Sequence, residues 1–201
     1  MHLSSGETVT KVLMQHKIYA LFDFELNRQK GYSLHDFIQL PKVGSAVLLQ
    51  YRDKVSSRAQ KIENLLFLKK HFHAPVIVND DLSLLPYVDG LHVGQEDLLR
   101  FDTDIEKAVQ HLRREAGNKL LGLSTHNLHE IEVANRLPLD YIGLGAYRNT
   151  TTKNVTHILG ENIAALAAKS LHDVAVIGGV KSDDKIANAA YLVLGSDLYE
   201  N

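Results

Sequence analysis

Eight short runs rich in Val, Ile and Leu, spread over most of the chain, constrain the fold more than any other feature of this sequence. They span residues 17–24, 45–51, 74–79, 89–94, 119–124, 140–145, 173–178 and 191–196. Polar and apolar residues alternate little within them, which is typical of strands that are covered on both faces. We therefore expect eight buried strands.

Segments with helical patterns lie between several of these runs, at residues 57–71, 103–116 and 127–136. In the second segment, one face of the helix carries the apolar residues Ile105, Ala108, Val109 and Leu112. Thr103 and Glu106 have the spacing of a capping box, which predicts that this helix begins beside Thr103.

Strands that alternate with helices predict a parallel sheet, because parallel strands need long crossover connections. Eight such strands favour a single (β/α)8 TIM barrel over residues 1–201. A doubly wound open sheet is the alternative, but residues 24–33 lack the G-x-G-x-x-G loop that commonly follows its first strand. Few residues follow the eighth run, so the final helix is expected to be short or missing.

Composition narrows the class of protein further. The chain has 201 residues, 45% of them hydrophobic, which is enough for one substantial core. A net charge of −2 argues against nucleic-acid partners. The chain has no Cys, no secretory signal in residues 1–16 and no apolar run long enough to span a membrane. We expect a cytoplasmic protein without a membrane or nucleic-acid partner.

The active site of a (β/α)8 barrel is built at the C-terminal ends of its strands. Polar residues and glycines follow seven of the eight predicted strands. In chain order, the candidates are Gln50, Tyr51, Arg52, Asp53, Lys54, Asn79, Asp80, Asp97, Ser124, His126, Thr150, Thr151, Thr152, Lys153, Gly179, Gly195 and Ser196. Cations, carboxylates, hydroxyls and glycines together can hold a metal-bound polyphosphate.

Two acidic pairs, Asp80-Asp81 and Glu96-Asp97, follow the third and fourth strands. Carboxylates on adjacent strand ends can converge, and two of them suffice for Mg²⁺ when water and substrate phosphates complete its ligands. The alternative is that these carboxylates cap the helices that follow. The residues alone leave both interpretations open.

Two histidines invite a catalytic interpretation. His92 lies inside a predicted strand, so we expect it to be packed or hydrogen-bonded. His126 follows Ser124, but residues two apart on a strand end do not naturally form a nucleophilic Ser–His pair, and no third group is evident. Nucleophilic catalysis is therefore not favoured.

The segment after the sixth strand contains Thr150, Thr151, Thr152 and Lys153, which offer hydroxyl donors and a positive charge to an anion. Gly178-Gly179 and Gly195-Ser196 follow the seventh and eighth strands, where barrels often bind phosphate through backbone N–H groups. An exposed polar loop is the alternative, but the shared location favours a phosphate site.

An ordered set of motifs runs through nearly the whole chain. It consists of Q-Y-R-D-K (50–54), V-N-D-D (78–81), D-G-L-H-V-G-Q-E-D (89–97), G-L-S-T-H (122–126), D-Y-I-G-L-G (140–145), T-T-T-K (150–153) and I-G-G-V (177–180). This set resembles the thiamine phosphate synthase family, which also includes the TenI-like proteins.

The resemblance implies a (β/α)8 barrel enzyme, a transferase that couples hydroxymethylpyrimidine diphosphate to a thiazole phosphate and releases pyrophosphate. It implies that residues 50–54, Asn79, Ser124 and Lys153 contact the pyrimidine diphosphate, and that Asp80 and Asp97 hold Mg²⁺. Residues 150–152, Gly179, Gly195 and Ser196 would contact the thiazole phosphate. The implied mechanism is dissociative, so Arg52, Lys54 and Lys153 would stabilise the negative charge of the departing pyrophosphate. A homo-oligomer is a separate expectation.

Two other functions remain open at this point. A TenI-like thiazole tautomerase would use a histidine in the place of His126, and a non-catalytic barrel would bind thiamine precursors without turnover. The complete set of Q-x-R-x-K, N-D-D and G-Q-E-D motifs favours the synthase, because an enzyme without a diphosphate substrate has little need of it.

Overall fold

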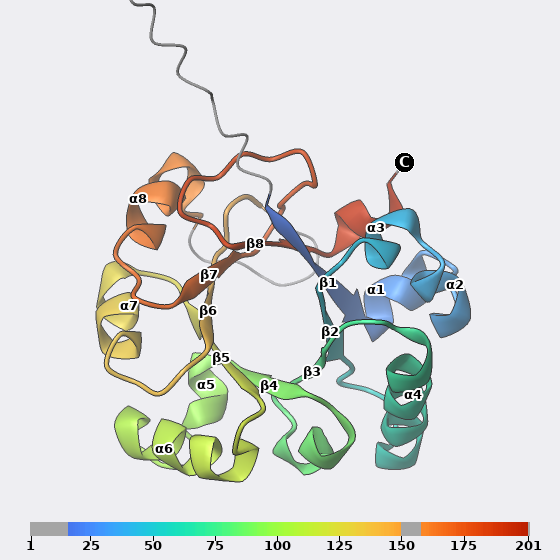
Figure 1. Ribbon diagram of the computed structural model, residues 1–201, viewed down its shortest axis with the longest axis horizontal. Helices are drawn as coiled ribbons and strands as arrows, with labels where there is room; N and C mark the ends of the chain where they lie inside the picture. Colours follow the sequence, from blue (N-terminus) through green and yellow to red (C-terminus); the bar gives the residue numbers. More distant parts are fainter. Residues whose placement is uncertain (1–15, 150–157, 201) are drawn as a thin grey trace, which may run out of the picture.

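Eight parallel strands close into a barrel in the computed structural model, which describes residues 16–149 and 158–200 (Figure 1). The strands are β1 (Lys17–Asp23), β2 (Leu48–Arg52), β3 (Val76–Asn79), β4 (Gly90–Val93), β5 (Leu120–Thr125), β6 (Tyr141–Leu144), β7 (Asp173–Val176) and β8 (Tyr191–Leu194). Each strand pairs with the next in sequence, and β8 pairs with β1. All eight predicted strands are confirmed, and so is the (β/α)8 barrel.

Helices surround the barrel on its outside (Figure 1). The α-helices are α1 (Phe24–Gln29), α2 (Leu34–Ile38), α3 (Pro41–Gly44), α4 (Arg58–His71), α5 (Gln95–Leu98), α6 (Ile105–Ala116), α7 (Leu128–Ala134) and α8 (Ile163–Ala167). The 3₁₀ turns of the described residues are η1 (Leu82–Tyr87), η2 (Gly160–Asn162) and η3 (Ser196–Tyr199). Within residues 16–149 and 158–200, none of these helices is long and apolar enough to cross a membrane.

The connections between consecutive strands differ in how much helix they contain. The β3–β4 connection contains only η1, and residues 177–190 between β7 and β8 form no helix. After β8, the described chain forms only η3.

Side-chain caps set the starts of the three helices that the sequence predicts. The side chains of Ser57 and Asn127 accept backbone hydrogen bonds at the starts of α4 and α7, as the helical patterns suggest. The predicted Thr103–Glu106 capping box is wrong, because α6 begins at Ile105 and its cap is Asp104. The carboxylate of Asp104 lies one residue nearer and accepts hydrogen bonds from two backbone N–H groups of the first turn.

Strand residues divide between two layers of the core. Alternate residues such as Tyr19, Ile77 and Tyr141 fill the barrel interior, and their neighbours pack between the strands and the helices. On β2, the same alternation turns Gln50 into the barrel and Tyr51 into the outer layer. Side-chain direction therefore decides which strand residues reach the site.

Candidate active site

Arg52 lies at the C-terminal end of β2, directly beside Asp23 at the end of β1. Its guanidinium forms an ion pair with the carboxylate of Asp23, which is 3% exposed. The other oxygen of Asp23 accepts a hydrogen bond of 2.9 Å from the N–H of Leu26 and caps α1. A buried and fixed carboxylate therefore holds the Arg52 guanidinium in place.

Lys54 follows β2 and is more exposed than Arg52. Its ammonium lies 3.6 Å from the carboxylate of Asp80, which follows β3. The two cations of the Q-Y-R-D-K segment thus each lie beside a carboxylate of a neighbouring strand end.

The other two polar residues of this segment do not join them. The Tyr51 ring stacks on Phe22 in the outer layer, and its hydroxyl donates to Asp53 over 2.8 Å and accepts from Asn64 of α4. Asp53 also accepts the backbone N–H groups of Val55 and Ser56, at 3.0 and 2.9 Å. Tyr51 and Asp53 shape the loop after β2, and their predicted contact with substrate stays a prediction.

Asp80 and Asp97 converge on Gly94, which lies at the end of β4. The Asp80 side chain accepts the N–H of Gly94 over 3.1 Å, and the backbone of Asp80 has a positive φ of 61°. A methyl group at Gly94 would lie 3.2 Å from one Asp97 oxygen and 3.9 Å from an Asp80 oxygen. The two carboxylates predicted to bind a metal are therefore brought together, and their side chains are only 15% and 14% exposed.

The electrostatics of this pair favour a bound cation. Partial burial, followed by the negative charge of Asp80, raises the pKa of the Asp97 carboxyl above its ordinary value, although Arg100 at 2.9 Å opposes the shift. A divalent cation between the two carboxylates would remove this repulsion. Among the described residues, no group of three or more His, Asp or Glu gathers at one place, so Mg²⁺ would depend on water and substrate for its other ligands.

The helix-capping role that the sequence left open for the Asp80-Asp81 pair belongs to Asp81. Asp81 accepts the N–H of Ser83 over 3.1 Å and caps η1. Asp80 does not cap η1 and instead contacts Gly94 and Lys54.

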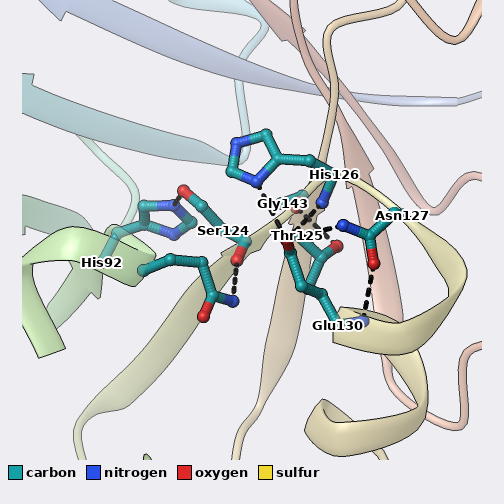
Figure 2. Close-up of polar contacts among 8 residues, drawn as sticks. His92, Ser124, Thr125, His126, Asn127, Glu130 and Gly143 are labelled. Atoms are coloured by element: carbon teal, nitrogen blue, oxygen red, sulfur yellow. Dashed lines mark hydrogen bonds and ion pairs between the residues drawn. The ribbon is translucent and has the colours of Figure 1, made fainter. Parts of the chain in front are cut away.

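Ser124 lies at the end of β5, beside the ring of His92 (Figure 2). Its Oγ is 3.0 Å from His92 Nε2, and its carbonyl oxygen accepts the side-chain amide of Gln95 over 2.7 Å. The Asn79 amide reaches the carbonyl oxygen of His92 at 3.4 Å. The prediction that His92 is a hydrogen-bonded strand residue is confirmed.

His126 contacts the side chain of Glu130 (Figure 2). Its backbone N–H donates to Glu130 over 2.7 Å, and its Nδ1 lies 3.0 Å from the same oxygen. Asn127 donates to the other oxygen of Glu130, so this carboxylate organises the start of α7. The structure contains no Ser124–His126 pair, as expected.

Glycines line the opposite part of the C-terminal edge. Gly179 has a φ of +63°, and a methyl group there would lie 2.8 Å from Cβ of Arg148 in the segment after β6. Arg148 donates to the Gly179 carbonyl oxygen over 3.0 Å and to both oxygens of Asp184 over 2.7 Å. A methyl group at Gly195 would meet no atom of the described residues within 4 Å, so these residues leave the backbone there open. Thr150, Thr151, Thr152 and Lys153 lie outside the described residues.

The candidates predicted from the sequence did not include Asp23 or Asp184. Asp23 is the last residue of β1 and the last but one of the first predicted strand, so the rule that assigned the other strand ends to the site could also have included it. Asp184 lies between β7 and β8, and no local pattern marks it as the partner of Arg148. Both orient an arginine at the C-terminal edge.

Comparisons with known proteins identify the family of this chain. A model of the thiamine monophosphate synthase family matches residues 25–191. The thiamine-phosphate synthase of Chloroflexus aurantiacus is 36% identical over 185 residues, which cover 89% of this chain and 79% of that protein. The thiamine-phosphate synthase of Persephonella marina is 34% identical over 83% of this chain and 78% of its own length.

A solved structure, the thiamine phosphate pyrophosphorylase of Pyrococcus furiosus, superposes with a TM-score of 0.66 and covers 92% of this chain and 91% of its own. At 20% identity, that likeness supports the fold alone. The family follows from the sequence matches, which include the strand ends carrying Arg52, Asp80 and Asp97. This chain belongs to the thiamine monophosphate synthase family.

Proposed function

We propose that this protein is a thiamine-phosphate synthase. It would couple hydroxymethylpyrimidine diphosphate to a thiazole phosphate, forming thiamine phosphate and pyrophosphate. The observation that carries the proposal is the convergence of Lys54, Asp80 and Asp97 at the ends of β2, β3 and β4, with Arg52 held by Asp23 at the end of β2. This group of charges suits a diphosphate, and relatives named thiamine-phosphate synthase support the same reaction.

In the proposed reaction, the bond between the pyrimidine methylene carbon and the diphosphate oxygen breaks, and the electron pair leaves with pyrophosphate. The thiazole nitrogen then donates its lone pair to the methylene carbon. Arg52 and Lys54 would stabilise the departing negative charge, and Asp23 would keep Arg52 oriented without having to reorganise it. No side-chain nucleophile is required, which is consistent with the different hydrogen-bond partners of Ser124 and His126.

Mg²⁺ is the proposed cofactor, and Asp80 and Asp97 would hold it. When bound, Mg²⁺ would offset charge on a diphosphate. The proposal rests on the convergence of the two carboxylates at Gly94 and on the raised pKa of Asp97.

The remaining contacts belong to the two organic substrates. Gln50, Asn79 and Ser124 would meet the pyrimidine diphosphate, with Lys153 beside its phosphates. Thr150, Thr151 and Thr152, with the backbone at Gly179, Gly195 and Ser196, would bind the thiazole phosphate. A cytoplasmic location and a homo-oligomeric state stay predictions.

Magnesium is expected to raise the melting temperature of the protein. A ligand at 100 times its Kd stabilises the folded state by about 2.7 kcal/mol, which is roughly 5 to 10 °C for a chain of this size. The rise should shrink as pH falls through the raised pKa of Asp97, because protons then compete with the cation. Thermal unfolding with Mg²⁺ or chelator at several pH values measures this.

Without Mg²⁺, the stability of the folded protein should change with pH in the opposite direction and rise as pH falls. A carboxyl whose folded pKa is raised holds its proton more tightly in the folded state, so ionised Asp97 lowers stability at neutral pH. Protonation removes that penalty as pH falls. An equal Mg²⁺ effect in the wild type and in Asp97→Asn would contradict the proposed metal site.

A coupling assay with both substrates and Mg²⁺ tests the function, with formation of thiamine phosphate as the expected result. Interconversion of thiazole tautomers without coupling would instead support a TenI-like tautomerase that uses His126. Metal-dependent binding of the pyrimidine diphosphate without turnover would support a binding barrel. Either of these results would refute the synthase.

A further inference from the structure

Five polar side chains form a continuous hydrogen-bonded chain through the barrel interior. Gln50 Nε2 donates to the Tyr19 hydroxyl over 3.0 Å, which lies 2.8 Å from the Tyr141 hydroxyl. The Tyr141 hydroxyl is 3.0 Å from His92 Nδ1, and His92 Nε2 is 3.0 Å from Ser124 Oγ. We call this set, Gln50, Tyr19, Tyr141, His92 and Ser124, the buried relay.

The buried relay joins residues that are far apart in the sequence and come from β2, β1, β6, β4 and β5. Tyr19, Tyr141, Gln50 and His92 are 1%, 3%, 5% and 7% exposed, whereas Ser124 is only partly buried at the C-terminal edge. The buried relay therefore begins and ends at Gln50 and Ser124, both of which are predicted to contact the pyrimidine diphosphate.

The barrel interior is shaped around these rings. A methyl group at Gly122 would lie 2.2 Å from Cζ of Tyr141, and one at Gly143 would lie 3.0 Å from Cε1 of His92. The ring of His92 stacks on that of Tyr141, with centroids 5.5 Å apart. Glycines at two strand positions are thus needed to admit the two rings.

A buried polar group without a partner destabilises a protein, so the hydrogen positions along this chain are tightly constrained. Burial raises the pKa of Tyr19 and of Tyr141 far above the ordinary tyrosine value, which keeps both phenols protonated. Each phenol has one hydrogen to donate, and a neutral imidazole has one N–H and one accepting nitrogen. The direction of one hydrogen bond therefore fixes the direction of the next.

The direction that is compatible with all four of these hydrogen bonds starts at Gln50. Its amide donates to Tyr19, so the Tyr19 hydrogen points to Tyr141 and the Tyr141 hydrogen points to His92 Nδ1. His92 then carries its proton on Nε2 and donates to Ser124 Oγ. With this lone pair engaged, Ser124 directs its own hydrogen away from His92.

We propose that Tyr19 and Tyr141 are positioning residues that, through the tautomer of His92, make the Ser124 hydroxyl a hydrogen-bond donor to the diphosphate of the substrate. This inference rests on the proposed function. Phosphate oxygens accept hydrogen bonds and donate none, so a serine fixed as a donor suits them. The donor would be in place before charge develops on the leaving group, which is the condition for effective stabilisation.

Tyr141→Phe tests the proposal, because it removes the hydroxyl that joins Tyr19 to His92 and keeps the ring. We expect roughly a tenfold fall in kcat with little change in KM for the pyrimidine diphosphate. The ¹⁵N spectrum of the His92 ring should move from the Nε2–H tautomer toward a mixture. Ser124→Ala added to Tyr141→Phe should cause much less loss than it does alone.

Tyr191→Phe is the matched control. Tyr191 packs edge-to-face on Tyr19, with ring centroids 6.3 Å apart, but its hydroxyl is not part of the buried relay. It should retain the wild-type kcat and His92 spectrum. Equal losses in the two variants, or an unchanged His92 spectrum in Tyr141→Phe, would overturn the proposal.

Two further measurements keep the test decisive. If Tyr141→Phe does not fold, Tyr19→Phe removes the preceding hydroxyl and should shift the His92 tautomer in the same direction by a smaller amount. If the wild-type protein does not couple the two substrates, the proposed function fails. The ¹⁵N spectra of the wild type and the variants then still decide whether the buried relay sets the His92 tautomer.

Discussion

Asp80→Asn is expected to lower kcat/KM for thiamine phosphate formation by roughly 10²- to 10³-fold, the range found when one group that stabilises transition-state charge is removed. Asparagine keeps an oxygen for the N–H of Gly94 and tolerates the positive φ of 61° at this position. The substitution therefore removes one negative charge from the proposed metal site with little change to the fold. Steady-state kinetics over a range of Mg²⁺ concentrations measure the loss.

Asp81→Asn is the matched control for this prediction. Asp81 is the next residue in the chain, and its contact with the N–H of Ser83 can also be made by asparagine. Its activity should stay within about twofold of the wild type, since surface substitutions rarely have large effects. The metal assignment would be wrong if the two variants behaved alike, or if Asp80→Asn kept full activity at limiting Mg²⁺.

Arg52→Ala should reduce kcat/KM by roughly 10³-fold, because the guanidinium presents several donors to a diphosphate and is already oriented by Asp23. Arg52→Lys should recover only part of this activity, since an ammonium cannot form the same paired hydrogen bonds. The comparison of the three proteins under identical conditions separates the effect of charge from that of geometry.

Asp23→Asn probes the orientation of Arg52 without removing the cap of α1, because the asparagine oxygen can still accept the N–H of Leu26. We expect a loss of about tenfold, smaller than that of Arg52→Ala. If Asp23 acts through Arg52, the double variant should be no worse than Arg52→Ala alone. Multiplicative losses would indicate that Asp23 acts independently.

Much of the fold could be predicted because buried parallel strands leave a strong local signal. Runs such as residues 74–79 are apolar on both faces, and that pattern persists whatever the strand pairs with. Helix starts depended on single side chains. Asp104 displaced the expected cap at Thr103 because its carboxylate lies next to the first turn of α6.

The location of the candidate site could be predicted from the sequence, but the residues that form it could be predicted only in part. Asp80 and Asp97 follow adjacent strands, so their convergence followed from the barrel alone. Tyr51 and Asp53 lie in the same motif as Arg52, yet the alternation of side chains along β2 turns Tyr51 into the outer layer. The alternation places Gln50, Arg52 and Lys54 on one side of this segment, but the motif alone does not show that this side faces the site.

The sequence by itself determined the eight strands, the edge of the barrel where the candidate site lies, and the types of side chain present there. The tertiary structure alone decided which of those side chains meet. Tyr19 and Tyr141 are 122 residues apart, and the hydroxyls touch because the barrel closes and Gly122 leaves room for a ring. Strand patterns are local consequences of burial, whereas contacts across the barrel depend on closure of the whole sheet.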